Sequence, residues 1–232
     1  IAQSEALCGC RFVKYWIHNG FVDINNEKMS KSLGNFTMIK AVLENYPAEV
    51  IRMFLLSNHY RSPIDYSENS MRDAGLGLDR IYAFLERLET AGIGSGSQTG
   101  GSLWQAFSQA MDDDFNTAKA QACVFEAVKN GNRFLDDAGE KPDAETVAVL
   151  EAIHADIRAI SDILGIFMLS PADYFGAKKQ KGMADQAISP EEVDALIQER
   201  TQARKDRNFA RADEIRDLLQ EKKILLEDGP QG

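Results

Sequence analysis

The sequence lacks the features of a membrane protein or of a secreted, disulfide-bonded protein. No apolar run in its 232 residues reaches the roughly 18–20 residues needed to cross a bilayer. Residues 1–5 are not a signal peptide, because no basic stretch is followed by an apolar one. The three cysteines are few and unevenly placed, which predicts reduced thiols in a cytoplasmic protein. Cys8 and Cys10 have no second ligand pair beside them, so we interpret them as ordinary thiols rather than as zinc ligands.

The sequence also lacks an excess of basic residues. Its net charge is −10, which argues against non-specific nucleic-acid binding. Binding of one structured RNA through local basic patches stays open, because screening makes the field near a site depend on nearby charges. The sequence shows no internal repeat and does not start with Met, so we expect it to begin within a longer chain.

The first part of the sequence mixes aromatic residues with turn residues. Residues 12–17 predict a short strand or a buried segment, and residues 20–24 predict a second strand after the turn signal Asn19-Gly20. A polar, glycine-containing loop covers residues 28–35.

Helical periodicity dominates the following residues. Ser67 is a suitable N-cap for a helix with apolar residues at helical spacing. The Gly- and Ser-rich residues 92–102 predict a flexible connection, and three more helices are predicted near 103–111, 117–135 and 143–168. Their apolar positions would pack together as a helical bundle: Phe107, Met111, Ala120, Cys123, Val124, Val128, Val147, Leu150, Ile153, Ile157, Ile160, Ile163 and Leu164.

A second boundary is predicted at residues 176–188, which contain two glycines and three lysines. Ser189 and Pro190 then start a helix that runs to about Lys205. A further helix is predicted over 209–222 and a strand over 223–228. The fold class is therefore mainly α.

The strongest chemical signal is the string Lys28-Met29-Ser30-Lys31-Ser32. A polar loop with two ammonium groups and two hydroxyls can close over a triphosphate and neutralise the charge that develops as pyrophosphate leaves. Lysine suits this role because it is a compact point charge on a flexible stem. A solvated surface loop is the alternative for the string taken alone.

The string resembles the KMSKS signature of class I aminoacyl-tRNA synthetases, and its surroundings resemble the cysteinyl-tRNA synthetase family. The resemblance covers essentially the whole chain and is weakest over 136–188. The strings that carry it are residues 1–5, 15–18, 19–22, 27–36, 59–62, 111–117 and 227–232. The resemblance implies an end of the catalytic domain with the stem-contact region (1–66), a helical bundle (67–175), a linker (176–188) and a small α+β anticodon-binding domain (189–232).

The resemblance also implies an activity. Family members activate cysteine with ATP and Mg to cysteinyl-adenylate and transfer it to cysteine tRNA. Lys28 and Lys31 would be catalytic, and all five residues of the string would bind ATP. The first signature motif has no match in this sequence, and the family's zinc ligands would precede Ile1. We therefore expect this chain alone to be inactive but able to bind tRNA, and the parent ligase to be a cytoplasmic monomer.

The resemblance assigns anticodon contacts near the C-terminal end. Arg204, Asp213 and Asp228 match contact positions, and Phe209 lies where relatives often have another aromatic. Carboxylates can accept hydrogen bonds from base edges, and an aromatic ring can stack on an unpaired base. By composition alone, a solvated helix with balanced charges would be favoured.

Other residues and functions stay open at this stage. We interpret Asp112, Asp113 and Asp114 as residues near a helix terminus rather than as a metal site, with Asp114 or Asn116 as the cap before Thr117. His154 is expected on a helix surface, and His18 has either a structural or a substrate-proximal role. Two rival functions are a free-standing tRNA-binding module without catalysis and the mycothiol-pathway cysteine ligase, which should lack the segment 189–232.

Overall fold

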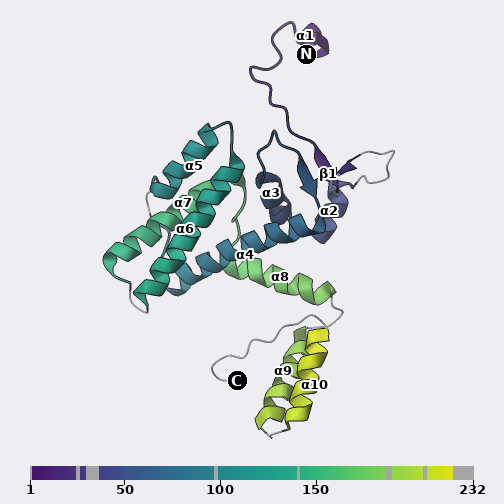
Figure 1. Ribbon diagram of the computed structural model, residues 1–232, viewed down its shortest axis with the longest axis vertical. Coiled ribbons are helices and arrows are strands. Elements are labelled where there is room, and N and C mark those ends of the chain that lie inside the picture. The colour runs from purple at the N-terminus through teal and green to yellow at the C-terminus, as the bar shows by residue number, and fades with distance from the viewer. Residues whose placement is uncertain are drawn as a thin grey trace. The chain divides into compact units, whose positions relative to one another are not determined.

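The computed structural model describes residues 2–24, 27–29, 37–96, 99–139, 142–185, 190–205 and 208–221. The chain forms two compact units, residues 1–171 and residues 172–232, and helices dominate both (Figure 1). The elements of the first unit are α1 (Ala2–Cys8), β1 (Val22–Ile24), β2 (Glu27–Lys28), α2 (Ile39–Asn45), α3 (Ala48–Leu56), β3 (Ile64–Tyr66), α4 (Glu68–Thr90), α5 (Ser102–Asp112), α6 (Thr117–Ala138) and α7 (Ala144–Leu164). Helix α8 (Pro171–Asp185) begins at the boundary, and α9 (Pro190–Lys205) and α10 (Phe209–Glu221) follow. The mainly helical fold class is confirmed, and no described helix is long and apolar enough to span a bilayer.

A small sheet contains Lys28, the first residue of the signature string. Its strand order is β2–β1–β3, with β1 antiparallel to β2 and parallel to β3. Asp23 lies opposite Lys28 on one side and opposite Asp65 on the other. The strand predicted over residues 20–24 is confirmed, although only residues 22–24 belong to β1.

The strand or buried segment predicted over residues 12–17 is wrong for the described structure. Tyr15 is 85% exposed and Trp16 is 51% exposed, and neither lies in a strand. Apolar composition favours a strand, but a strand needs a neighbour that pairs with its backbone groups. No described strand pairs with this segment.

Helix α4 is the long central helix of the first unit (Figure 1). The hydroxyl of Ser67 accepts a hydrogen bond from the Ser70 amide at 3.2 Å, and the Ser70 hydroxyl accepts one from the Ser67 amide at 2.9 Å. These two bonds form a capping box, which satisfies amides that the helix itself cannot bond. The predicted Ser67 cap is therefore confirmed.

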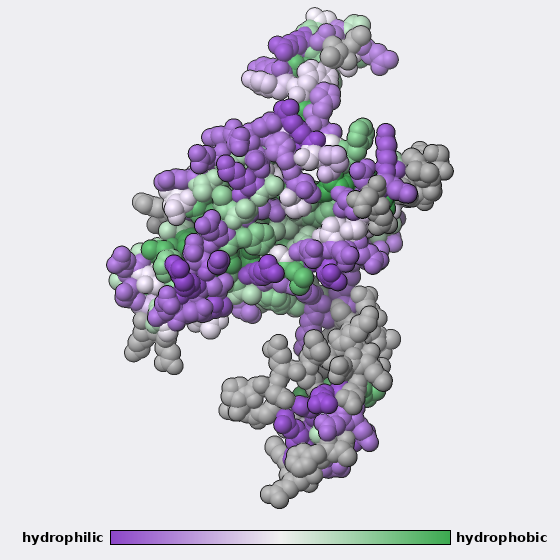
Figure 2. Space-filling view, viewed as in Figure 1, coloured by the Kyte–Doolittle hydropathy of each residue, from purple (hydrophilic) through white to green (hydrophobic). Residues whose placement is uncertain are grey.

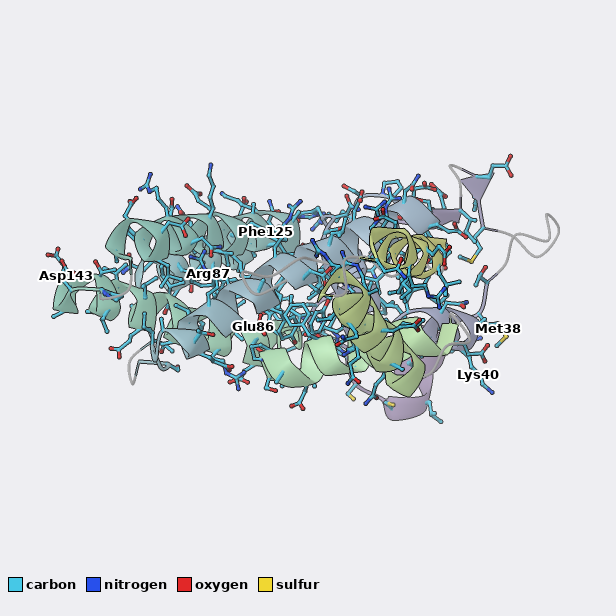
Figure 3. All side chains as sticks on the ribbon, turned by 90° about the horizontal axis from the view of Figure 1, so that it is seen from below. Met38, Lys40, Glu86, Arg87, Phe125 and Asp143 are labelled. Atoms are coloured by element: carbon cyan, nitrogen blue, oxygen red, sulfur yellow. The ribbon has the colours of Figure 1, made fainter. Side chains whose placement is uncertain are left out.

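The core of the first unit lies between α4 and the helices that pack around it. Helix α6 packs on α4, and α5, α6 and α7 pack against one another. A Cβ atom at Gly131 of α6 would lie 2.5 Å from Phe84 of α4, so the missing side chain lets these helices approach closely. Figure 3 shows Phe125 on α6 beside α4. Most predicted core positions are buried, but Ile163 is 55% exposed because it lies on the solvent face of α7 with Asp162.

The end of the Gly- and Ser-rich connection between α4 and α5 is bonded to a distant residue of α7. The buried carboxylate of Asp156 on α7 accepts hydrogen bonds from the amides of Gly100 (3.0 Å), Gly101 (3.2 Å) and Trp104 (3.0 Å). Three amides at the start of α5 are thus satisfied by a residue far away in the sequence. A composition rich in Gly and Ser could not reveal this distant acceptor.

The turn after α7 is held by a carboxylate from α3. Glu49 accepts hydrogen bonds from the Tyr82 hydroxyl at 2.8 Å, from the Phe167 amide, and from the Met168 amide at 3.3 Å. Burial and the bond to Glu49 raise the pKa of Tyr82. His154 is half-buried on α7 rather than on the helix surface, which corrects the prediction for that residue.

In the second unit, α9 and α10 form a helical hairpin. Its buried side chains are small or aliphatic, and they come from both helices: Ala203, Ala212, Ile215 and Leu219. The predicted helices over 189–205 and 209–222 are confirmed, whereas the strand predicted over 223–228 lies outside the described residues. Helix α8 covers residues 176–185 of the expected linker, and its lysines are compatible with a helix.

Candidate functional site

The structure describes only the first two residues of the signature string. Lys28 ends β2, and its Nζ atom lies 4.8 Å from the centroid of the Phe21 ring. This distance is in the range of a cation–π contact, which holds the ammonium group on an aromatic face. Met29 follows without regular structure. The predicted residues Ser30, Lys31 and Ser32 lie outside the described residues.

An open pocket of about 770 Å³ adjoins Lys28 and Met29. Its lining is mostly apolar and comes from the sheet and from α2, α3 and the start of α4: Phe21, Val22, Lys28, Met29, Thr37, Met38, Ile39, Lys40, Val42, Ile51, Phe54, Leu55, Tyr66 and Met71. Figure 3 shows Met38 and Lys40 at this end of the first unit. Lys28 and Lys40 are the cations of this lining, so among the described residues the pocket combines apolar walls with two ammonium groups.

A polar cluster joins the loop before β3 to the turn between α5 and α6. The Tyr60 hydroxyl donates to Asp114 Oδ1 at 2.9 Å. Arg61 Nε lies 2.8 Å from Asp114 Oδ2 and donates to the Tyr60 hydroxyl at 2.7 Å. His59 stacks on Tyr60 with ring centroids 4.9 Å apart. Sequence spacing gave no signal for this cluster, because Tyr60 and Asp114 are 54 residues apart.

The contacts of Asp114 differ from those of a helix cap. The cap of α6 is Asn116, whose side chain accepts a hydrogen bond from the Lys119 amide at 3.0 Å. Asp114 instead bonds Tyr60 and Arg61. The Tyr60 hydroxyl, and then the charge of Arg61, hold the pKa of Asp114 below its usual value of 3.8, so the carboxylate is ionised at neutral pH.

The α9–α10 hairpin carries two of the four predicted anticodon contacts in described positions. Arg204 lies in the last turn of α9, and Asp213 lies in the second turn of α10; both are exposed. The Asp213 carboxylate is 3.7 Å from Arg216. The side chain of Phe209 and the whole of Asp228 lie outside the described residues. Arg204 and Asp213 therefore lie on the two different helices of the hairpin.

Arg211 has a structural role that the sequence did not reveal. Its guanidinium bonds Glu199 of α9 at 2.9 Å and Glu214 of α10 at 3.0 Å. These carboxylates raise the pKa of Arg211 and tie the two helices together at the surface.

Metal ligands do not gather in the described part of the chain. Cys8 and Cys10 are free and exposed, and no group of three or more His, Cys, Asp or Glu residues there is arranged to hold a metal ion. His18 is exposed. The described residues of this chain therefore do not fit a zinc site.

Three family models match the chain in succession. Residues 1–75 match the tRNA synthetases class I (C) catalytic domain, residues 106–168 match the DALR domain, and residues 189–232 match the cysteinyl-tRNA ligase anticodon binding domain. The last match covers the α9–α10 hairpin, and the first covers the sheet and the signature string.

Curated relatives align with the whole chain. It is 47% identical to the cysteine–tRNA ligase of Pelobacter propionicus over 250 residues, which is 100% of this chain and 50% of that protein. It is 49% identical to that of Geobacter metallireducens over 243 residues, again 100% of this chain and 50% of the relative. The chain thus spans about half the length of the curated relatives it matches. A partial match to the LeuRS of Agrobacterium radiobacter in a ternary complex has a TM-score of 0.46 at 22% identity, covering 62% of this chain and 20% of that one.

Proposed function

Because the chain belongs to the cysteine–tRNA ligase family, we propose that it forms part of an enzyme that joins cysteine to cysteine tRNA. In the first step, the cysteine carboxylate attacks the α-phosphorus of Mg-bound ATP, which gives cysteinyl-adenylate and releases pyrophosphate. In the second step, the terminal adenosine of the tRNA takes the cysteinyl group and AMP leaves. The observation that carries the proposal is the ordered match of all three models along one chain.

The signature string supplies the charge for the first step. Lys28 and Lys31 would neutralise the charge that develops on the leaving pyrophosphate, and Met29, Ser30 and Ser32 would complete the ATP contacts. Lys28 is held on the Phe21 ring at the end of β2, so it enters the site from a paired strand rather than from a free loop. In this proposal the zinc ion that binds the cysteine thiolate is held by residues outside this chain.

The hairpin would supply the RNA specificity. Arg204, Asp213 and Asp228 would bond base edges of the cysteine anticodon, and Phe209 would stack on a base. Exposure of Arg204 and Asp213 on the hairpin supports their availability to a partner. We further propose that the enzyme is a cytoplasmic monomer.

Cysteine-dependent ATP–pyrophosphate exchange tests the catalytic proposal. The full-length protein that contains this chain should show exchange, whereas the 232-residue chain alone should show none above background. Lys31→Ala in the full-length protein should slow activation by roughly 10²–10³-fold, with a much smaller change in ATP binding. Lys129→Ala, at an exposed position of α6, is the matched control. Absence of exchange by the full-length protein, together with tRNA binding, would instead support a free-standing tRNA-binding module.

Binding isotherms with cysteine tRNA and with an anticodon-swapped tRNA test the hairpin. Asp228→Ala and Asp213→Ala should each lower the ratio of the two affinities by about 5- to 150-fold, since a good base contact gives about 1–3 kcal/mol of discrimination. Asp137→Ala, exposed on α6, is the matched control at the same salt concentration. An unchanged ratio would show that the position does not read the anticodon.

A further inference from the structure

The turn between α5 and α6 has an unusual backbone. Asp114 and Phe115 are successive non-glycine residues with positive φ angles of 54° and 55°. Residues other than glycine rarely adopt this backbone conformation, and it persists only where the surrounding structure holds it. The Phe115 amide bonds the Met111 carbonyl at 3.0 Å, and the Asn116 amide bonds the Ala110 carbonyl at 3.1 Å. The turn thereby presents the Asp114 carboxylate to the loop that precedes β3.

The Asp114 carboxylate contacts three side chains of the loop that precedes β3. Asp114 Oδ1 accepts from Tyr60 at 2.9 Å and from Arg61 Nη2 at 3.2 Å, while Oδ2 lies 2.8 Å from Arg61 Nε and 3.9 Å from His59 Nε2. The two contacts with Arg61 form a fork, which fixes direction as well as distance. An exposed ion pair of this kind contributes little to stability, so its consequence is the orientation of residues 59–62.

The other side of the same loop bonds the chain that leads into the signature string. The Gly20 amide donates to the Tyr60 carbonyl of this loop at 2.7 Å, and just after the loop the Ile64 amide, at the start of β3, donates to the Phe21 carbonyl at 2.9 Å. A Cβ atom at Gly20 would lie 2.2 Å from the Ser62 carbonyl oxygen, so only glycine permits this approach. Phe21 directly precedes β1, and the Lys28 ammonium lies over its ring.

The contacts therefore form a continuous series from the helical bundle to Lys28. We propose that Asp114 is a positioning residue for the signature string: it fixes the loop of residues 59–62 on the bundle, and that loop fixes the β1–β2 hairpin that ends at Lys28. The inference rests on the proposed function, because it assumes that the string acts on ATP. It places a determinant of activation on the helical bundle, 86 positions after Lys28.

Amide hydrogen exchange on the 232-residue chain tests the structural part without any activity. Asp114→Ala should raise exchange about two- to fivefold in peptides covering residues 20–24 and 60–66, the range expected for loss of an exposed ion pair. Peptides from the cores of α4 and α7 should not change. Asp113→Ala is the matched control, because Asp113 is an exposed neighbour whose carboxylate lies 3.9 Å from Lys119 and does not contact the loop. Unchanged exchange over residues 20–24, or a uniform rise across the bundle, would overturn the proposal.

Single-turnover formation of cysteinyl-adenylate by the full-length protein tests the consequence. Asp114→Ala should lower the activation rate about tenfold at saturating ATP, with a smaller effect on the KM for ATP, since misplacement affects the transition state more than ground-state binding. Asp114→Glu, which keeps the charge, should recover part of the rate. Lys31→Ala separates the two proposals: if it slows activation and Asp114→Ala does not, only the positioning role is wrong. If neither variant slows activation, the proposed role of the string is wrong.

Discussion

The two parts of the first unit differ in how they are held. Among the described residues from 2 to 49 none is buried, whereas residues 50–171 contain the whole apolar core of the unit. The first part, residues 2–49, includes the signature string and strands β1 and β2. The second part consists mainly of helices α4 to α7. Figure 2 shows apolar surface running across the bundle between hydrophilic margins.

The difference separates stability from chemistry. Burial of apolar side chains stabilises the bundle, and this stabilisation does not depend on the signature string. The residues that lead into β1 are placed instead by a few backbone hydrogen bonds, such as those of Gly20 with Tyr60 and of Phe21 with Ile64 of β3. The described residues from 2 to 49 contribute no buried side chain to the core, so these hydrogen bonds matter more for their placement than apolar packing does.

The largest contrast is expected from truncating one leucine in each part. Leu78→Ala removes a fully buried side chain of α4 and should lower the free energy of unfolding by about 2–5 kcal/mol. Leu43→Ala removes a side chain that is 47% exposed on α2 and should cost less than about 1 kcal/mol. Urea unfolding of both variants at an unchanged m-value checks this difference. Equal losses of unfolding free energy would mean that residues 2–49 contribute to the core as much as the bundle does.

An intermediate effect is expected from two carboxylates that cap helices of the bundle. Asp156→Ala would leave three amides near the start of α5 without their buried acceptor and should cost about 1–3 kcal/mol, because the three bonds are partly buried and end on one charged carboxylate. Asp143→Ala removes one exposed bond from the Thr146 amide at 2.8 Å and should cost about 1 kcal/mol. Asp143 lies at the end of the unit remote from Met38 (Figure 3). Thermal unfolding measures the loss of stability in each variant. A larger loss for Asp143→Ala than for Asp156→Ala would contradict the role of Asp156 as a buried acceptor.

The smallest effect is a pH dependence of the bundle. Burial lowers the pKa of His154 from its usual value of 6.5, and its Nδ1 atom is buried without a hydrogen-bond partner among the described residues. The fold favours the neutral ring, so this contribution to stability is present above pH 6.5 and is lost as the pH falls through the lower pKa of the folded state.

Unfolding measured at pH 7.5 and at pH 5.5 should therefore show a stability loss in the wild-type chain that His154→Gln reduces. His18→Gln, at an exposed position before β1, is the matched control and should keep the wild-type pH dependence. If the wild-type chain and both variants lose the same stability between pH 7.5 and pH 5.5, groups other than His154 cause the pH dependence.

Much of the helical fold was predictable because its signals are local. Ser67 as a cap, Pro190 near a helix start and the apolar spacing of α4 to α7 are properties of neighbouring residues, and the structure confirms the helices they predicted. The signature string was predictable for the same reason, since five consecutive residues carry it. Residues 12–17 were predicted wrongly, because a strand depends on a partner that is distant in the sequence.

The sequence by itself therefore determined the family, the helices and the residue types available for chemistry. The tertiary structure alone decided which distant groups meet: Asp156 with the start of α5, Glu49 with the turn after α7, and Asp114 with Tyr60 and Arg61. Helical periodicity and capping act over three or four residues and leave a pattern that can be recognised along the chain. A carboxylate that bonds a group 50 or more residues away leaves no such pattern, because its partner is set by how the helices pack.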